Sequence, residues 1–249
     1  MGAFDGRVAV VTGGSRGIGW SIADAFAREG ADVVIASRKF DACSVAADRL
    51  RAEYDVRALP VAFHAARWDD CDRLAETVDK EFGRCDVLVN NAGMSPSYPS
   101  LREVDEAYYD KVSGVNLKGP FRLSILLAEQ MSDGGAIVNV STIGSLRPGV
   151  DELVYACAKA GLNALTVGLA AAYAPTVRVN ALLPGPVETD IASGWSDETR
   201  ATAVGSMPLA RMGRADDFAG PALWLAGADS AFVTGTLIRV DGGLYRQTS

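Results

Sequence analysis

Short apolar runs alternate along the chain with longer stretches whose apolar residues recur at helical spacing. The short runs indicate buried strands, and the longer amphipathic stretches indicate helices. Strands are predicted at Arg7–Val11, Asp32–Ala36, Arg57–Phe63, Val87–Asn90, Ala136–Val140, Val177–Leu182 and Thr236–Val240. Helices are predicted between them near Ile18–Glu29, Ala42–Glu53, Cys71–Phe82, Glu103–Val115, Phe121–Met131, Leu153–Ala172 and Asp216–Leu225. Because strands that alternate with helices form βαβ units, we predict an α/β fold: one doubly wound parallel sheet of about seven strands with helices on both faces.

The chain shows no internal repeat, low-complexity run or linker, which predicts one domain over residues 1–249. Its least regular stretch is Pro184–Pro208, which is rich in Gly, Pro, Ser and Thr. In a doubly wound fold, the loops after the carboxyl ends of strands border the ligand site. We therefore predict a substrate lid at residues 184–208; the alternative is an ordinary long connection.

Composition and charge narrow the classes of function. Apolar residues make up 49% of the chain and charged residues 22%, as in an ordinary globular protein. The net charge of −7 disfavours nucleic acid and anionic membranes as partners. We expect no membrane span, because no apolar run approaches the required length. We expect no secretion signal, because Met1–Gly6 lacks a charged and then apolar segment.

Cysteine and histidine usage argues against a metal site. The four cysteines are scattered without a CxxC spacing, and the chain has one histidine. Since zinc sites need clustered Cys and His ligands, we expect no metal. A chain with this much core does not need disulfides, which predicts reduced thiols and a cytoplasmic location.

A glycine cluster lies between the first predicted strand and the first predicted helix. Glycine is required where the backbone turns tightly and approaches a pyrophosphate, and the helix start offers free N–H groups to the phosphates. The alternative is a merely tight βα turn, but the position after the first strand favours dinucleotide binding. The residues predicted to bind a cofactor in this turn are Gly13, Ser15, Arg16, Gly17, Ile18 and Gly19.

The end of the second strand bears on the choice of cofactor. NAD enzymes commonly have a carboxylate there that binds the ribose 2′-hydroxyl. Here the strand ends in Ser37-Arg38-Lys39, without a carboxylate, and Asp32 lies at its other end. Ser37, Arg38 and Arg16 suit a 2′-phosphate, so NADP(H) is favoured over NAD(H). The alternative is that Arg38 and Lys39 form a solvated turn.

Tyr155 and Lys159 are spaced i, i+4 in a predicted helix and therefore share one face. A phenol ordinarily titrates near pH 10, and a nearby ammonium group lowers that pKa toward working pH. Such a pair can act as an acid/base. Taken alone, the same spacing describes an ordinary surface pair.

Taken together, six features occur in an order that resembles the short-chain dehydrogenase/reductase family: the glycine-rich turn, Asn90-Asn91-Ala92-Gly93, Asn116, a hydroxyl residue before Tyr155, Lys159 and Pro184-Gly185. The similarity extends from Gly6 to Gly243. It implies a single Rossmann-type domain, usually a homotetramer, that transfers hydride between NAD(P) and a carbonyl or alcohol.

The resemblance also implies roles for individual residues. Tyr155 would be the acid/base, and Lys159 would bind the nicotinamide ribose and lower the pKa of Tyr155. Asn116 would hold a water that links Lys159 to solvent. The further residues implied to contact the cofactor are Asn91, Ala92, Gly93, Pro184, Gly185, Val187 and Thr189.

Two positions depart from the family pattern. The substrate-orienting serine is replaced by Thr142, with Ser141 as the alternative; threonine keeps the hydroxyl but adds bulk. After the third strand, His64-Ala65 stands where many relatives have Asp-Val. His64 is therefore predicted at the adenine edge, beside Ala65, or else is simply packed at the strand end.

The predicted substrate-facing residues carry no charged cluster that could bind a carboxylate or phosphate, although several could simply pack the loops. They are Met94, Ser95, Pro96, Tyr98, Ile143, Gly144, Leu146, Ile191 and Trp195. The leading hypothesis is an NADP(H)-dependent enzyme for a largely apolar carbonyl or alcohol, with an acyl-carrier ketoacyl reductase as one variant. The alternative from another class is a cofactor-binding sensor or scaffold, which would typically lack Tyr155 or Lys159.

Overall fold

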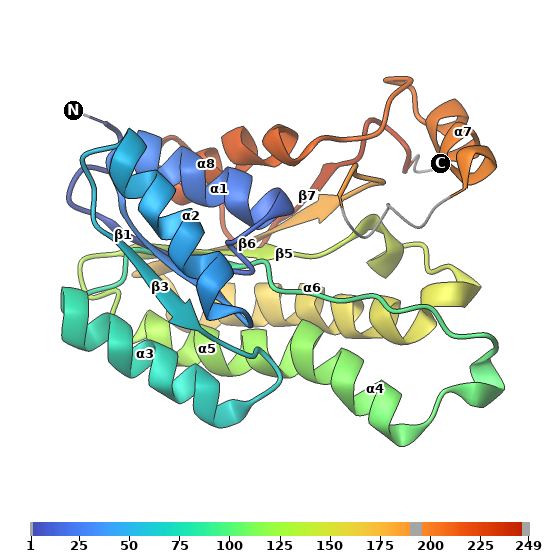
Figure 1. Ribbon diagram of the computed structural model, residues 1–249, viewed down its shortest axis with the longest axis horizontal. Helices are drawn as coiled ribbons and strands as arrows, with labels where there is room; N and C mark the ends of the chain where they lie inside the picture. The colour runs from blue at the N-terminus through green and yellow to red at the C-terminus, as the bar shows by residue number, and fades with distance from the viewer. Residues whose placement is uncertain (1, 190–195, 246–249) are drawn as a thin grey trace.

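The computed structural model describes residues 2–189 and 196–245, and its centre is one parallel sheet (Figure 1). The strand order is β3-β2-β1-β4-β5-β6-β7, and each pair of neighbouring strands is parallel. The strands are β1 Val8–Thr12, β2 Asp32–Ser37, β3 Ala58–Ala62, β4 Val87–Asn90, β5 Gly135–Val140, β6 Val177–Pro184 and β7 Leu237–Val240. Strands β1 to β3 are added toward one edge of the sheet, and β4 to β7 are added on the other side of β1 toward the opposite edge. The predicted doubly wound, Rossmann-type α/β fold is therefore confirmed.

Helices cover both faces of the sheet (Figure 1). One face carries α1 (Gly17–Arg28), α2 (Phe40–Glu53) and α8 (Ala219–Ala226); the other carries α3 (Trp68–Phe82), α5 (Gly119–Ala128) and α6 (Leu153–Tyr173). Side chains alternate between the faces along each strand, so Ala9 and Val11 pack in the first layer, while Val8 and Val10 pack in the second. This two-sided burial explains why the strands are continuous apolar runs.

The predicted helices Glu103–Val115 and Phe121–Met131 are one helical stretch with an irregular turn. Helix α4 (Glu106–Ser113) begins after Asp105, whose side chain accepts a hydrogen bond from the Tyr108 N–H at 2.7 Å. It passes through a π-turn, Gly114–Lys118, into α5. The two predicted helices are therefore present but are joined without a loop, and Pro120 is tolerated because it occupies the first turn of α5, where a missing N–H is not needed.

The structure corrects several other element boundaries. Helices α2 and α3 begin at Phe40 and Trp68, two and three residues before the predicted starts. Strand β6 continues to Pro184, two residues beyond its prediction. The predicted helix Asp216–Leu225 is a 3-10 turn, Ala215–Phe218, followed by α8.

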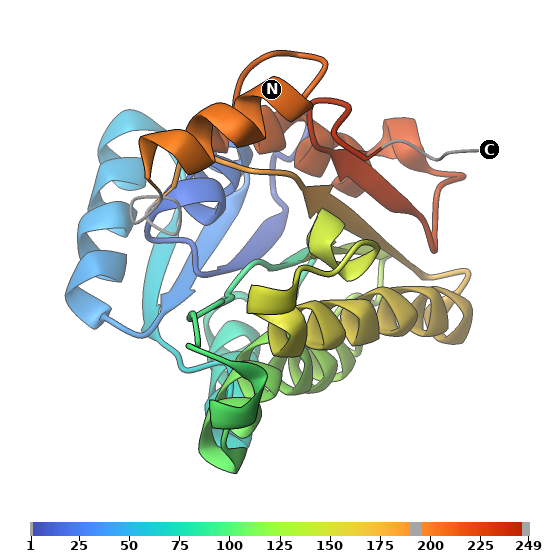
Figure 2. The ribbon, with the colours of Figure 1, turned by 90° about the vertical axis from the view of Figure 1, so that its right-hand side faces the viewer.

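A helix was missed inside the stretch 184–208. Helix α7 (Asp197–Ser206) begins after Ser196, whose hydroxyl accepts the Thr199 N–H at 3.1 Å. It buries no residue of its own, so it lacks the apolar periodicity that marked the other helices. Figure 2 shows α7 in orange, above the yellow start of α6.

We expected no apolar run long enough to span a membrane, but one helix meets that requirement in its length and composition alone. The stretch Val150–Tyr173, which contains α6, has an 18-residue window of mean hydropathy 1.4. Half of that window is buried inside the structure, and Leu162, Leu169 and Ala170 pack into the protein. The helix is apolar because it is a core helix rich in Ala and Leu.

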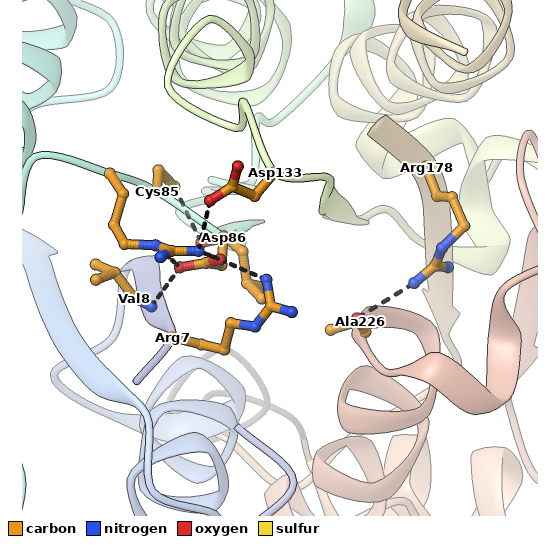
Figure 3. A network of polar contacts seen from close by, with 9 residues as sticks. Arg7, Val8, Cys85, Asp86, Asp133, Arg178 and Ala226 are labelled. Carbon is orange, nitrogen blue, oxygen red and sulfur yellow. Dashed lines mark hydrogen bonds and ion pairs between the residues drawn. The ribbon is translucent and has the colours of Figure 1, made fainter. Parts of the chain in front are cut away.

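Two arginine-centred networks tie the layers together (Figure 3). Asp86 accepts hydrogen bonds from Arg7 at 2.7 Å, from Arg84 at 2.6 Å and from the Val8 N–H at 2.9 Å. Burial raises the pKa of Asp86, but these donors outweigh burial, so its pKa lies below the ordinary value. Arg178 on β6 donates to carbonyls at the end of α8, among them Leu225 at 2.7 Å, and so caps that helix.

Candidate active site

The glycine-rich turn joins β1 directly to the start of α1, and its glycines are sterically required. Gly13 and Gly17 have φ angles of 66° and 56°, in the left-handed region. A Cβ on Gly19 would lie 2.3 Å from the Gly13 carbonyl oxygen. The first N–H groups of α1 lack intrahelical partners, as in every helix, and can receive an anion.

Asn91, at the end of β4, holds this turn. Its Nδ2 donates to the carbonyl oxygens of Thr12 at 2.9 Å and Gly13 at 3.3 Å. The Thr12 hydroxyl accepts the N–H groups of Asn91 and Ala92, each at 3.0 Å. The structure thus brings the glycine-rich turn and the Asn91–Gly93 segment together. Sequence reasoning missed Thr12, whose buried hydroxyl joins the turn to Asn91 and Ala92. The signal that could have identified it is a polar residue at the end of an otherwise apolar strand.

The end of β2 lies beside the same turn. The hydroxyls of Ser37 and Ser15 are 3.0 Å apart, and the Ser37 hydroxyl is also 3.0 Å from the buried Cys43 sulfur. Arg38 is exposed, and Arg16 immediately precedes α1. Two hydroxyls and two guanidinium groups therefore come from the same two segments, with no carboxylate at the end of the strand.

His64 and Ala65 follow β3. The His64 N–H donates to Asp70 at 2.9 Å, and its ring Nδ1 accepts the Ala66 N–H at 3.3 Å. Ala65 is buried, and a Cβ on Gly119 would lie 2.0 Å from its carbonyl oxygen. His64 is thus half-buried and held by local hydrogen bonds at the strand end.

Tyr155 and Lys159 lie on one face of α6, as their spacing predicted. The Lys159 Nζ is 5.8 Å from the centre of the Tyr155 ring. Lys159 is buried and donates to the Val140 carbonyl oxygen at 2.7 Å. The Thr142 side chain lies close enough to the Tyr155 phenol to lower its pKa.

The two titratable groups respond to burial in opposite directions. Burial lowers the pKa of Lys159 to about 7. Burial also raises the pKa of Tyr155 above its ordinary value, as does the charge of Glu152, while the Thr142 hydrogen bond lowers it. Because burial leaves Lys159 only partly protonated near neutral pH, its charge acts weakly on the phenol. The lowering of the Tyr155 pKa by Lys159 therefore stays a prediction.

Asn116 lies at the centre of the π-turn and is completely buried. Its Nδ2 donates to the carbonyl oxygens of Met94 at 2.8 Å and Val112 at 2.9 Å, and its Oδ1 accepts the Met94 N–H at 3.3 Å. A Cβ on Gly93 would lie 3.1 Å from Asn116 Oδ1 and 3.7 Å from Lys159 Nζ. Asn116 and Lys159 thus meet at Gly93, which has no side chain that would come between them.

The hydroxyls of Ser141 and Thr142 point to different places. The Ser141 hydroxyl is buried and donates to the Lys159 carbonyl oxygen at 3.3 Å. Thr142 accepts the Gly144 N–H at 3.2 Å, and its carbonyl oxygen accepts the Ser145 hydroxyl at 2.6 Å. Asn163 on α6 donates to the Ser145 hydroxyl at 2.7 Å. Thr142, rather than Ser141, presents its hydroxyl to Tyr155.

The segment after β6 returns to the glycine-rich turn. The Gly185 N–H donates to the Val240 carbonyl oxygen at 3.1 Å, and the buried Val187 forms a bridge with Gly213. The methyl group of Thr189 lies 3.7 Å from the position of a Cβ on Gly17. Pro184 is the last residue of β6. The segment that contains these four predicted residues therefore borders the turn.

The predicted substrate-facing residues within segments 94–98 and 143–146 lie on two loops that meet at the start of α6. Tyr98 bridges them: its hydroxyl donates to the Val150 carbonyl oxygen and accepts the Leu153 N–H at 2.9 Å. The Tyr98 ring packs edge-on against Tyr108, with 5.6 Å between ring centres. The Tyr108 hydroxyl donates to the Pro96 carbonyl oxygen. One tyrosine thus fixes both loops relative to α6.

The remaining members of that set differ in exposure. Met94, Ser95 and Ile143 are half-buried, Gly144 is buried, and Leu146 is exposed. Ile191 and Trp195 lie outside the described residues, as does part of the predicted lid. Sequence reasoning missed Glu152, a half-buried carboxylate three residues before Tyr155. The signal was its helical spacing from Tyr155.

The donor set fits a nicotinamide dinucleotide and offers little to a metal. The groups that would hold the dinucleotide are the glycines with left-handed backbone angles, the start of α1, the hydroxyls of Ser15 and Ser37, and Gly93, which has no side chain. Within residues 2–189 and 196–245, no three His, Cys, Asp or Glu side chains gather as a metal ion would need. All four cysteines are free thiols.

Comparisons with known proteins cover nearly the whole chain. A family profile described as enoyl-(acyl carrier protein) reductase matches residues 13–245. The L-rhamnose 1-dehydrogenase (NAD(P)(+)) of Azotobacter vinelandii is 39% identical over 248 residues, covering 96% of this chain and 96% of that protein. The 3-oxoacyl-[acyl-carrier-protein] reductase of Thermotoga maritima is 35% identical, and the match covers 97% of this chain and 98% of that protein. A solved structure with a similar fold is that of a gluconate 5-dehydrogenase from Burkholderia cenocepacia in complex with NADP and tartrate. It is 31% identical in sequence, has a TM-score of 0.91, and the match covers 96% of this chain and 95% of that protein.

Proposed function

Because the chain belongs to the short-chain dehydrogenase/reductase family, whose members act on CH–OH and C=O groups, we propose that it transfers hydride between NADP(H) and a largely apolar carbonyl or alcohol. The observation that carries this proposal is the grouping of Tyr155, Thr142 and Lys159 at the start of α6, next to Asn116 and Gly93. A non-catalytic sensor would have no need of this grouping.

In the reducing direction, Tyr155 gives its phenolic proton to the carbonyl oxygen of the substrate. Thr142 orients that oxygen through its hydroxyl, and Lys159 binds ribose hydroxyls of the cofactor. A dihydronicotinamide bound there would supply a hydride to the carbonyl carbon. Asn116 holds a water next to Lys159 through which the phenolate regains a proton from solvent. Oxidation of the alcohol runs through the reverse steps.

The preference for NADP(H) rests on the end of β2. Ser37 and Ser15 offer hydroxyl donors, and Arg38 and Arg16 offer guanidinium groups that suit a 2′-phosphate. The relatives support a nicotinamide cofactor in general: one solved structure contains NADP, and the rhamnose enzyme is named for both NAD and NADP. His64 and Ala65 border the adenine in this proposal.

The relatives do not select one substrate, since their names include a sugar dehydrogenase and an acyl-carrier reductase. An apolar carbonyl compound fits the half-buried Met94 and Ile143. We further propose one domain over residues 1–249, a homotetramer in the cytoplasm and a lid within residues 184–208. No nucleic acid or membrane partner is part of this proposal.

Two measurements test the function. Fluorescence titration with NADPH and NADH measures cofactor binding, and a panel of carbonyl compounds measures turnover of the protein. Tyr155→Phe should bind NADPH with nearly unchanged affinity while kcat falls by at least about 100-fold, the contribution of a general acid. Near-normal turnover in this variant would disprove the proposed role of Tyr155. Tight cofactor binding without turnover of any carbonyl would favour the sensor instead.

A further inference from the structure

Glu152 is a charged group at the active site that the proposed chemistry does not use. It directly precedes α6 and lies three residues before Tyr155, on whose phenol its charge acts. Its side chain is half-buried. The residues that the sequence predicted to face the substrate include no carboxylate.

The Glu152 carboxylate lies beside Thr142. A Cβ on Gly144 would stand 2.5 Å from Glu152 Oε1 and 3.5 Å from Thr142 Cγ2. Because Gly144 has no side chain, the carboxylate and the threonine methyl group converge there. Both Glu152 and Thr142 act on the pKa of the Tyr155 phenol, Glu152 by raising it and Thr142 by lowering it, so the carboxylate lies close to the proposed acid/base.

No cation compensates this charge within the part of the chain that the structure describes. No ion pair there includes Glu152; a backbone hydrogen bond at Gly149 lowers its pKa, and the neighbouring Asp151 has the same sign and raises it. Burial raises the pKa of Glu152, and its charge raises the pKa of Tyr155. A half-buried carboxylate with one backbone donor is costly, and such groups concentrate where a ligand uses them.

We infer that the Glu152 carboxylate binds a hydroxyl group on the carbon next to the reacting carbonyl, so that the preferred substrate is a neutral hydroxy-carbonyl compound or the matching vicinal diol. This inference rests on the proposed function and specifies its substrate. Tyr155 and Thr142 bind the carbonyl oxygen, and Glu152 accepts a hydrogen bond from the adjacent hydroxyl. The same charge repels a carboxylate at that carbon.

Three ketones that differ only at the neighbouring carbon test the inference: acetophenone, 2-hydroxyacetophenone and benzoylformate. The variants are Glu152→Leu, which removes the acceptor, and Glu152→Gln, which keeps an acceptor of the same shape without the charge. Asp151→Asn removes a charge from the adjacent exposed residue and serves as the control. Thermal melting of each variant checks the fold.

With 2-hydroxyacetophenone, Glu152→Leu should lower kcat/KM by about 10- to 100-fold, the effect of losing a hydrogen bond to a charged group. Glu152→Gln should lower it less, and Asp151→Asn should change it less than about twofold. With acetophenone, Asp151→Asn should stay near wild type, and the two Glu152 variants should change kcat/KM less than they do with 2-hydroxyacetophenone, because only the effect of the Glu152 charge on the pKa of Tyr155 is lost. With benzoylformate, kcat/KM should rise in both Glu152 variants because the repulsion is gone.

Equal losses on acetophenone and 2-hydroxyacetophenone would overturn the inference, because they would mean that Glu152 only holds the loop. Equal activity of wild type and variants on all three ketones would also overturn it. In both cases the proposed oxidoreductase function would stand. Absence of turnover of any carbonyl compound or alcohol with either cofactor would overturn the proposed function and this inference with it.

Discussion

The side-chain amine of Lys159 donates a hydrogen bond to the backbone carbonyl oxygen of Val140 at 2.7 Å. This contact joins α6, which also carries Tyr155, to the last residue of β5, which precedes Ser141 and Thr142. It places a buried amine at a fixed point between the proposed acid/base and the proposed cofactor site. A buried amine has a direct effect on stability that can be measured without knowing the substrate.

Lys159 should make the stability of the protein depend on pH. Its pKa is about 7 in the folded protein and ordinarily 10.5, so between these values the unfolded chain binds a proton that the folded protein does not. The contribution of Lys159 to stability therefore rises with pH from 7 to 10.5, whereas below pH 7 its burial penalty is fully present. Denaturant melts of wild type and Lys159→Met should converge or cross as pH rises from 7 to 9.5. Stability curves that stay parallel would contradict the low pKa.

Thr142 should be replaceable by serine but not by alanine or valine. Serine keeps the hydroxyl that lowers the pKa of Tyr155, so kcat should stay within about threefold of wild type. Thr142→Ala and Thr142→Val lose the hydrogen bond that lowers the pKa of Tyr155, so kcat should fall by about 10- to 100-fold, and the pKa seen in the kcat–pH profile should rise. Measuring kcat from pH 6 to 10 for the three variants tests this. Serine and alanine variants with the same profile would argue against a role for the hydroxyl.

Arg38→Asp should shift cofactor preference toward NADH. The change removes a guanidinium group at the end of β2 and adds a carboxylate that repels a 2′-phosphate and can accept a ribose 2′-hydroxyl. We expect the ratio of NADPH to NADH affinity to fall by at least about tenfold, the size of one charge-assisted hydrogen bond. Lys39→Asp makes a charge reversal at the next exposed residue and should have a smaller effect. Similar shifts in both variants would mean that Arg38 is only part of a solvated turn.

Tyr98 should hold the start of α6 through its hydroxyl. Tyr98→Phe keeps the ring packed on Tyr108 but removes the bonds to Val150 and Leu153. Backbone amide exchange at the start of α6 should become faster, and KM should rise by about three- to tenfold while cofactor affinity is unchanged. Tyr109→Phe, at an exposed tyrosine of α4, is the control. Unchanged exchange at Leu153 in Tyr98→Phe would show that the hydroxyl does not hold the helix.

The sequence was informative where structure depends on neighbouring residues along the chain. Apolar runs predicted all seven strands, because both faces of this sheet are covered and the strand residues must be apolar. The glycine positions of the first turn were readable for a similar reason, since Gly13 and Gly17 need a backbone conformation that few other residues adopt. Helix α7 was missed because it buries no residue and so has no apolar stripe.

The sequence by itself determined the α/β class, the position of the glycine-rich turn and the shared helical face of Tyr155 and Lys159, since each follows from local periodicity or backbone sterics. Only the tertiary structure decided which groups meet. It placed Thr142 rather than Ser141 against Tyr155, joined Thr12 to Asn91, and brought Glu152 to Gly144. Burial also set the direction of the pKa shifts of Lys159 and Tyr155. Burial and contact arise from segments far apart in the chain, so no local pattern records them.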